Sequence, residues 1–247
     1  IHTISQDSMG FMWIGTQGGI VRFDGFKFDE IDAVNDTAGA LDKIDFQTFF
    51  RDHDYIFWLG VYNEFLISFN PYQNRVQYHK ISKPRHEGNR REYSYNFAED
   101  HEFRIWFING SGIFCYDPYT GIDTSIRIPD QYPNADNEVL TTIYFDSFST
   151  EIQCGTDKGN IYHINAITYG ITKSGFDADS NTDIHQIYRS DKNSMWIATS
   201  SGLFKYNPES KTQEVYTSDG AGTNRLSHNF VNCMLPDIHQ NLWLGTQ

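Results

Sequence analysis

A cluster of basic and aromatic residues lies between residues 80 and 95. Five of the 19 lysines and arginines fall within residues 80–93, although the whole chain carries a net charge of −13. Arginine guanidinium groups bind carboxylates and sulfates through paired hydrogen bonds, and tyrosine rings can stack on sugar rings. We expect this segment to bind an acidic oligosaccharide through Arg85, Arg90, Arg91, Tyr93 and Tyr95. The alternative is a solvated loop whose arginines pair with neighbouring glutamates.

Other spacings that could support chemistry are weaker. Residues 177–183 alternate oxygen-bearing side chains as the start of a calcium loop does, but Thr182 replaces the loop glycine and Tyr188 replaces the bidentate glutamate. This favours a polar connector, and we predict neither a metal nor a cofactor. The nine histidines show no ligand-like spacing, although His163 and His185 could meet in the folded chain. No nucleophile elbow, zinc helix or phosphate loop occurs, so no catalytic residue is predicted.

A repeated tryptophan marks the structural units that must position these segments. The repeat positions, 43 to 48 residues apart, are Trp13, Trp58, Trp106, Gln153, Trp196 and Trp243. All five tryptophans of the protein occupy this position, and only the fourth copy departs from it. Aspartate stands six residues earlier in four copies, at Asp7, Asp52, Asp100 and Asp237, and glycine stands six residues later at Gly19, Gly112, Gly159 and Gly202. Such a glycine suits a tight turn that needs positive φ.

Each repeat unit contains four short strand patterns separated by turn signals such as Asp24-Gly25 and Asn207-Pro208. Four strands in a repeat of 40–50 residues are typical of a β-propeller blade. The fold class predicted is therefore all-β, a propeller of four-stranded antiparallel blades. We expect the repeated tryptophan to pack between adjacent blades, where radial stacking leaves a wide gap.

The unit count predicts one propeller over residues 1–247, with five complete blades and half of a sixth. The predicted blades are residues 1–31, 32–81, 82–130, 131–176 and 177–217, followed by a partial blade at 218–247. The sixth unit lacks its third and fourth strands, which would leave an unpaired edge. We therefore expect the native ring to continue beyond residue 247, and the chain to be a piece of a longer protein.

Composition narrows the functional classes. Apolar residues make up 39% of the chain, aromatic residues make up 16%, and no stretch is long and apolar enough to span a bilayer. The net charge of −13 argues against binding to nucleic acid or to an anionic membrane. The three cysteines form no CxxC pair, and we predict that Cys115, Cys154 and Cys233 are buried structural thiols.

Two segments resemble a known family. Residues 4–24 read ISQDSMGFMWIGTQGGIVRFD, which is similar to the two-component regulator propeller repeat, I-x-Q-D-x-x-G-x-[IL]-W-[IL]-G-T-x-x-G-[IL]-x-[RK]-[FY]-D. Residues 226–231 read LSHNFV and resemble the L-S-x-N-x-V segment that leads into the first strand of that repeat. The resemblance covers the whole chain, strongly in units one, five and six and weakly in units two to four. The second unit lacks the turn glycine and threonine, and the fourth lacks tryptophan. No binding residue is carried over by the motif.

The resemblance implies the extracytoplasmic sensor region of a hybrid two-component system, usually a seven-bladed propeller. It implies a periplasmic ectodomain of an inner-membrane protein, with neighbouring sensor domains in the same chain and a homodimer in the full-length receptor. An oligosaccharide would be the ligand, and the output would be a histidine kinase and response regulator controlling polysaccharide-utilisation genes. The region itself would not be an enzyme.

Two other classes stay open. A carbohydrate-active propeller enzyme, such as a lyase or glycosidase, needs two carboxylates about 5–10 Å apart, and the 32 acidic residues allow such a pair. A passive protein-interaction scaffold of the WD-repeat kind is a further alternative, although the Trp-Ile-Gly-Thr phrase differs from the signature of those repeats.

Overall fold

The computed structural model describes residues 3–16, 19–31, 49–62, 65–82, 96–108, 112–129, 132, 138–220 and 225–247. These residues form strands β1 to β22 and no helix. No helix capable of crossing a bilayer occurs in this part of the chain. The chain divides into two compact units, Ile1–Ile126 and Arg127–Gln247, and each is described by itself.

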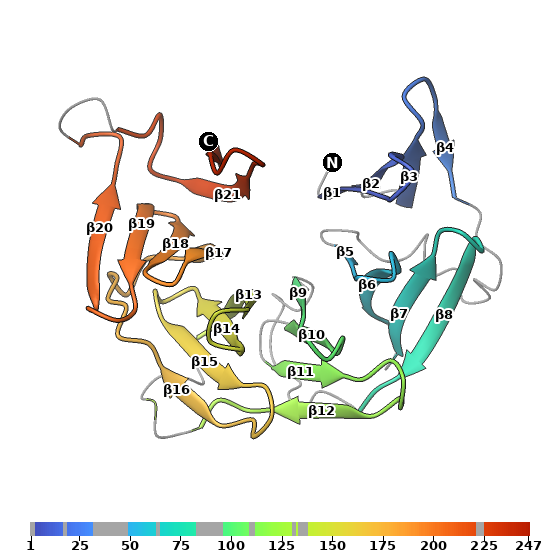
Figure 1. Cartoon of the computed structure of the whole chain (residues 1–247), viewed down its shortest axis with the longest axis horizontal. Coiled ribbons are helices and arrows are strands. Elements are labelled where there is room, and N and C mark those ends of the chain that lie inside the picture. Colours follow the sequence, from blue (N-terminus) through green and yellow to red (C-terminus); the bar gives the residue numbers. More distant parts are fainter. Residues whose placement is uncertain are drawn as a thin grey trace. The chain divides into compact units, whose positions relative to one another are not determined.

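The first unit contains three antiparallel sheets of four strands (Figure 1). Sheet 1 consists of β1 (Thr3–Gln6), β2 (Met12–Thr16), β3 (Gly19–Phe23) and β4 (Phe28–Glu30). Sheet 2 consists of β5 (Phe50–Arg51), β6 (Phe57–Tyr62), β7 (Phe65–Asn70) and β8 (Arg75–Lys80). Sheet 3 consists of β9 (Asn96–Glu99), β10 (Ile105–Ile108), β11 (Ile113–Tyr116) and β12 (Asp123–Ile126). In every sheet the strands lie side by side in chain order.

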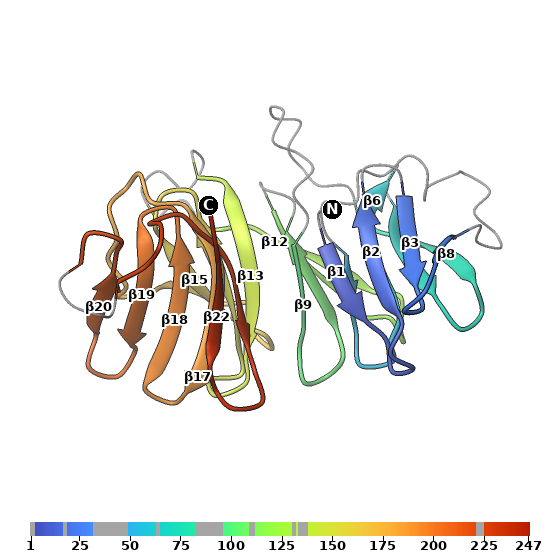
Figure 2. The ribbon, with the colours of Figure 1, turned by 90° about the horizontal axis from the view of Figure 1, so that it is seen from above.

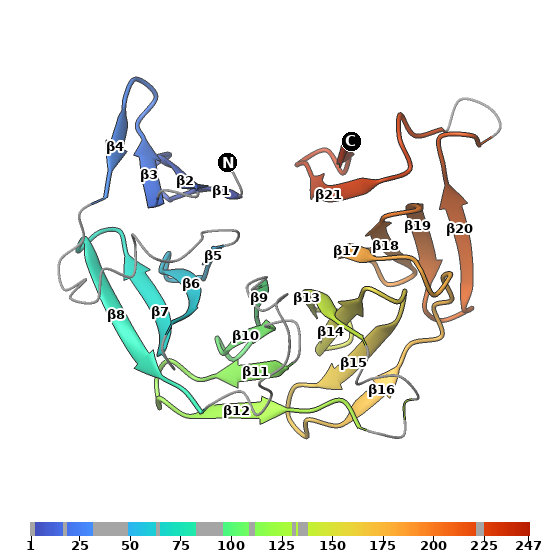
Figure 3. The same cartoon turned by 180° about the vertical axis from the view of Figure 1, so that it is seen from behind.

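The second unit repeats this arrangement. Sheet 4 consists of β13 (Leu140–Asp146), β14 (Glu151–Thr156), β15 (Ile161–Asn165) and β16 (Ile171–Lys173). Sheet 5 consists of β17 (Ile184–Asp191), β18 (Ser194–Thr199), β19 (Gly202–Asn207) and β20 (Thr212–Tyr216), and sheet 6 has only β21 (Val231–Pro236) and β22 (Leu242–Thr246). Figure 2 shows the strands of sheet 5 running side by side along their length, and Figure 3 shows the sheets of each unit from behind.

The turn between the first and second strands of a sheet is organised by the repeated aspartate. In sheet 1, Oδ1 of Asp7 accepts hydrogen bonds from the backbone N–H groups of Met9 and Phe11, at 2.9 and 3.0 Å. The residue three positions after the aspartate has positive φ in four sheets: Gly10 (89°), Tyr55 (62°), Phe103 (63°) and Gln240 (65°). The turn thus requires a left-handed residue, a conformation that glycine adopts without strain.

The turn between the second and third strands is closed by the repeated threonine and glycine. The hydroxyl of Thr16 donates to the carbonyl of Gly19 at 2.9 Å, and that of Thr199 donates to Gly202 at 2.7 Å. Both glycines have positive φ, 123° and 145°. These bonds explain why the Trp-Ile-Gly-Thr phrase is followed three residues later by glycine.

The core lies between the sheets of each unit. Trp13 of sheet 1 packs against Phe57 and Phe69 of sheet 2, with ring centroids 5.2 and 5.6 Å apart. Other clusters lie between sheets 2 and 3, between sheets 4 and 5, and between sheets 5 and 6. Buried aromatic and β-branched side chains dominate the clusters between sheets 1 and 2, 2 and 3, and 4 and 5, so burial of apolar surface between blades stabilises each unit.

Candidate functional site

The residues predicted to bind an acidic oligosaccharide, Arg85, Arg90, Arg91, Tyr93 and Tyr95, lie outside the described residues. The start of this segment is described. Ile81 is buried between sheets 2 and 3, and the backbone N–H of Ser82 donates to a carboxylate oxygen of Asp123 at 2.8 Å. The described start of this segment is therefore anchored beside the last strand of sheet 3.

The repeated tryptophan and the repeated aspartate form a hydrogen-bonded pair. The indole N–H donates to the carboxylate six residues earlier in four sheets: Trp13 to Asp7 at 2.8 Å, Trp58 to Asp52 at 2.7 Å, Trp106 to Asp100 at 2.7 Å and Trp243 to Asp237 at 3.1 Å. The aspartate therefore orders the turn with one oxygen and orients the tryptophan with the other. Trp13, Trp58 and Trp106 are buried, whereas Trp243 is 64% exposed. Trp196 lies in the cluster between sheets 5 and 6.

The fourth sheet preserves this bond without tryptophan. Nε2 of Gln153 donates to Oδ2 of Asp146 at 3.0 Å, so the glutamine amide replaces the indole N–H. Arg189 of sheet 5 donates to the same carboxylate oxygen at 2.9 Å, and both charged side chains are buried. We call the packed interface between two adjacent sheets a seam. The seam between sheets 4 and 5 is therefore polar at this position, whereas the seam between sheets 1 and 2 is aromatic.

A second polar chain crosses the seam between sheets 2 and 3. Nε2 of His79 lies 2.7 Å from the hydroxyl of Ser68, and Nδ1 lies 3.0 Å from the hydroxyl of Tyr116. Burial lowers the pKa of His79 to about 4, so the imidazole is neutral at pH 7. A serine beside a neutral histidine resembles a nucleophile and its base. However, Ser68 is only 3% exposed, so substrate cannot reach it and the chain is structural.

An exposed cluster of ionisable and aromatic groups joins the turns of sheets 2 and 3. His53 pairs with Glu99 through Nδ1 and stacks on the ring of Phe103, with centroids 3.9 Å apart. Nε2 of His53 lies 3.4 Å from Asp54 and 3.5 Å from the hydroxyl of Tyr119. Burial lowers the pKa of His53, but the hydrogen bond and charge of Glu99 outweigh it and the net shift is upward. The cluster therefore favours a charged histidine that links two blades.

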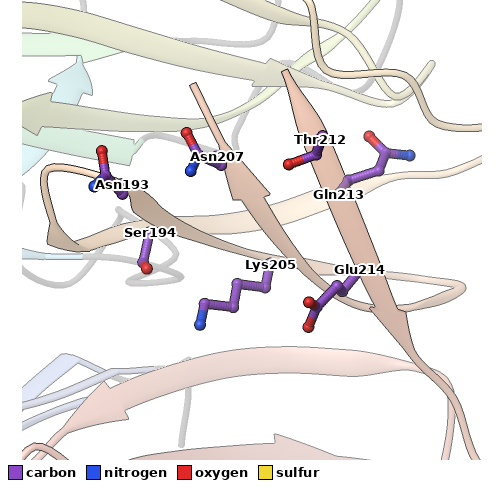
Figure 4. A pocket seen from close by; sticks show the side chains of 7 residues that line it. All are labelled: Asn193, Ser194, Lys205, Asn207, Thr212, Gln213 and Glu214. Atoms are coloured by element: carbon purple, nitrogen blue, oxygen red, sulfur yellow. The ribbon is translucent and has the colours of Figure 1, made fainter. Parts of the chain in front are cut away.

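A pocket of about 200 Å³ lies on one face of sheet 5 (Figure 4). It is lined by Asn193, Ser194, Lys205, Asn207, Thr212, Gln213 and Glu214. Lys205 is the cross-strand neighbour of Trp196 and Glu214, and its Nζ lies 5.5 Å from the Trp196 ring. Trp13 is the residue of sheet 1 that corresponds to Trp196, and its cross-strand neighbour is Arg22. Aromatic residues of sheet 2 cover Trp13. We interpret the pocket as part of a blade-packing face rather than as a ligand site.

The remaining predicted features have structural contacts. In the connector at 177–183, Thr182 is buried and its hydroxyl lies 3.0 Å from that of Ser201. Among the described residues no group of three histidine, cysteine or acidic side chains is arranged to hold a metal. His163 pairs with Glu151 at 3.3 Å, whereas His185 donates to the carbonyl of Val231 at 2.8 Å, so the two histidines have different partners.

The cysteine prediction was partly wrong. Cys115 and Cys154 are buried free thiols, and burial raises the pKa of Cys154. Cys233 is exposed. It lies on β21 of the two-stranded sheet 6, where it faces away from the core cluster that contains Val231 and Met234.

Sequence comparison links one repeat to a family. Residues 225–247 match the family described as two component regulator propeller, which confirms the resemblance at the last repeat. No curated protein matches the chain in sequence.

Three solved structures show the same fold. The extracellular domain of BT4673 from B. thetaiotaomicron, assigned to a hybrid two component system, has 15% identity and a TM-score of 0.58, with 99% of this chain and 37% of that chain covered. PorZ, a surface component of the type-IX secretion system of Porphyromonas gingivalis, has 16% identity and a TM-score of 0.70, with coverage of 99% and 37%. YCF48 from Cyanidioschyzon merolae has 11% identity and a TM-score of 0.64, with coverage of 95% and 76%.

These similarities confirm the predicted fold class, an all-β propeller of four-stranded antiparallel blades. The chain covers 37% of the BT4673 extracellular-domain chain and 37% of the PorZ chain. At these identities the likeness establishes the fold alone, because one fold serves many functions.

Proposed function

We propose that this region is part of the extracytoplasmic ligand-sensing propeller of a hybrid two-component system. The observation that carries the proposal is the match of residues 225–247 to the two component regulator propeller family. The structural similarity to the extracellular domain of BT4673, which covers 99% of this chain, supports the proposal. In this role the propeller binds a ligand and transmits a conformational change, with no chemistry of its own.

The proposed ligand is an oligosaccharide, and the proposed output is a histidine kinase that controls polysaccharide-utilisation genes. The region would then lie in the periplasm as the ectodomain of an inner-membrane protein, next to further sensor domains and within a homodimer. The basic segment at 80–93 supports an acidic sugar, because arginine pairs recognise carboxylate and sulfate groups.

A thermal-shift screen tests the sensing role. The protein is heated with acidic and neutral oligosaccharides, and a ligand that binds only the folded state raises the melting temperature. We expect a shift with an acidic oligosaccharide and no turnover of it. Turnover of the bound sugar would instead support a lyase or glycosidase.

The ligand site is tested separately by isothermal titration of an Arg90→Ala/Arg91→Ala double variant. We expect the affinity for the acidic oligosaccharide to fall at least about tenfold, since hydrogen bonds to charged groups contribute roughly 1.5–3 kcal/mol each. The matched control is Arg75→Ala/Lys173→Ala, which removes two exposed cations elsewhere and should leave the affinity unchanged. Equal affinities in both double variants would exclude this segment as the site without excluding a sensor.

A passive interaction scaffold is the second candidate, and the similarity to PorZ favours it. A scaffold would give no thermal shift with any sugar and would instead co-purify with a defined protein partner. The absence of a shift across the screen, together with such a partner, would replace the sensing proposal.

A further inference from the structure

The seam between sheets 4 and 5 contains a row of three polar side chains. Tyr144 of β13, Gln153 of β14 and His163 of β15 are direct cross-strand partners, so their side chains lie on one face of sheet 4. Arg189 of sheet 5 contacts this face, because its backbone N–H donates to the Tyr144 hydroxyl at 3.3 Å. The row therefore lies against the neighbouring blade.

Gln153 leaves one hydrogen-bonding group unsatisfied. The side chain of Gln153 is fully buried. Its Oε1 is one of two buried side-chain nitrogen or oxygen atoms that have no hydrogen-bond partner among the described residues. The amide cannot be reversed, because Nε2 must face the Asp146 carboxylate, which accepts but cannot donate. An unpaired buried carbonyl oxygen costs about 1–3 kcal/mol.

The two neighbours of Gln153 have complementary groups available. The Tyr144 hydroxyl accepts the N–H of Arg189, so its own proton remains to be donated. Nδ1 of His163 donates to the Glu151 carboxylate, so the other ring nitrogen of a neutral imidazole is an acceptor. Burial lowers the pKa of His163 and outweighs the charge of Glu151, which favours that neutral form.

We propose that one buried water molecule is bound between Tyr144, Gln153 and His163. It accepts a hydrogen bond from the Tyr144 hydroxyl, donates one hydrogen bond to Gln153 Oε1 and donates a second to the free nitrogen of His163. Three such bonds are usual for a buried water. The site exists because glutamine is shorter than the indole that occupies this position in other blades, and because this seam, unlike that of Trp13, offers polar partners.

A high-resolution crystal structure at pH 8 tests the site directly. We expect an ordered water within hydrogen-bonding distance of Gln153 Oε1 and of at least one of its two neighbours. A direct bond from a protein donor to Oε1, or an apolar contact in place of the water, would overturn the proposal.

Magnetic relaxation dispersion of water in solution provides a second test, because it counts long-lived internal waters. Gln153→Trp should remove one such water while the indole retains the bond to Asp146. Tyr144→Phe, which removes only the donor, should shorten the residence time of the water several-fold. Tyr216→Phe is the matched control, because Tyr216 packs between sheets 5 and 6 and its hydroxyl donates to Glu214, and it should change nothing. If neither Gln153→Trp nor Tyr144→Phe alters the count or the residence time, the proposal fails.

Discussion

At the scale of single residues, the aspartate six positions before the tryptophan performs two tasks. Asp52 accepts the indole N–H of Trp58 at 2.7 Å through Oδ2 and the backbone N–H of Ile56 at 2.8 Å through Oδ1. Burial raises the pKa of this carboxyl group, and Asp52 is only 8% exposed, so little water can replace those donors. In the same pair of sheet 6, Asp237 is only partly buried and Trp243 is exposed.

Replacing Asp52 by alanine should therefore lower the free energy of unfolding by about 2–3 kcal/mol, because two donors lose their buried acceptor. Asp237→Ala should cost about 1 kcal/mol or less, since water can reach the indole of Trp243. Urea unfolding followed by tryptophan fluorescence measures both values. Equal losses in the two variants would show that the burial of the pair does not set its contribution.

The residue pattern predicted where the repeated aspartate and tryptophan lie in the chain, but it did not predict how they interact. The spacing of Asp52 and Trp58 is visible in the sequence, but the hydrogen bond between them is not, since nothing in a spacing shows which atoms meet. Gln153 was interpreted as a lapse of the repeat, yet its amide preserves the bond to aspartate. The left-handed turn position was missed because Tyr55, Phe103 and Gln240 share no residue type.

At the scale of the blade, the glycine of the Trp-Ile-Gly-Thr phrase allows close approach between strands of adjacent sheets. A Cβ atom on Gly155 of β14 would lie 2.6 Å from Cγ2 of Ile184, in the first strand of sheet 5, and 2.8 Å from Cγ2 of Thr142. Sheet 5 has Ala198 at the same position, where its methyl group is buried against sheet 6.

Gly155→Ala should destabilise the protein by about 1–3 kcal/mol, because the two branched side chains or the sheets must move apart. The reciprocal change, Ala198→Gly, removes a buried methyl group without a clash and should cost about 1 kcal/mol. Thermal unfolding of both variants gives the comparison. If Gly155→Ala leaves the stability unchanged, sheets 4 and 5 can move apart at little cost in free energy.

The partly buried His79, between sheets 2 and 3, should make the stability of the protein depend on pH. The folded pKa of His79 is about 4 and its ordinary value is 6.5, so between these limits the unfolded chain binds a proton that the folded chain does not. The free energy of unfolding should therefore fall as the pH falls from 6.5 to 4, by up to about 3 kcal/mol.

His79→Phe tests this dependence. The variant should lose that part of the pH dependence, whereas His239→Gln, a change at an exposed turn, should retain it. Urea midpoints measured between pH 4 and 7 give the two slopes. A wild-type slope that persists in His79→Phe would assign the dependence to other groups.

At the scale of the whole chain, the repeat made the fold predictable. Each blade has the same Asp, Trp and turn signals, so six weak local patterns reinforced one prediction of an all-β propeller. The candidate ligand site was not predictable in the same way. Its arginines lie in a segment that breaks the repeat, and the periodicity that indicates strands carries no information about the conformation of such a segment.

The charge distribution of the chain leads to a last prediction. A chain with a net charge of −13 repels an acidic sugar at long range, so the binding that we propose would depend on the local cluster at 80–93. Short-range bidentate arginine contacts persist when salt screens the rest, whereas long-range repulsion does not. Raising ionic strength from about 0.02 to about 0.15 M should therefore change the affinity by less than about threefold, because the loss of repulsion offsets the weakened attraction. Titration calorimetry at the two ionic strengths measures this change. A tenfold or larger loss would indicate binding through diffuse electrostatic attraction, which the net charge of this chain does not supply outside that cluster.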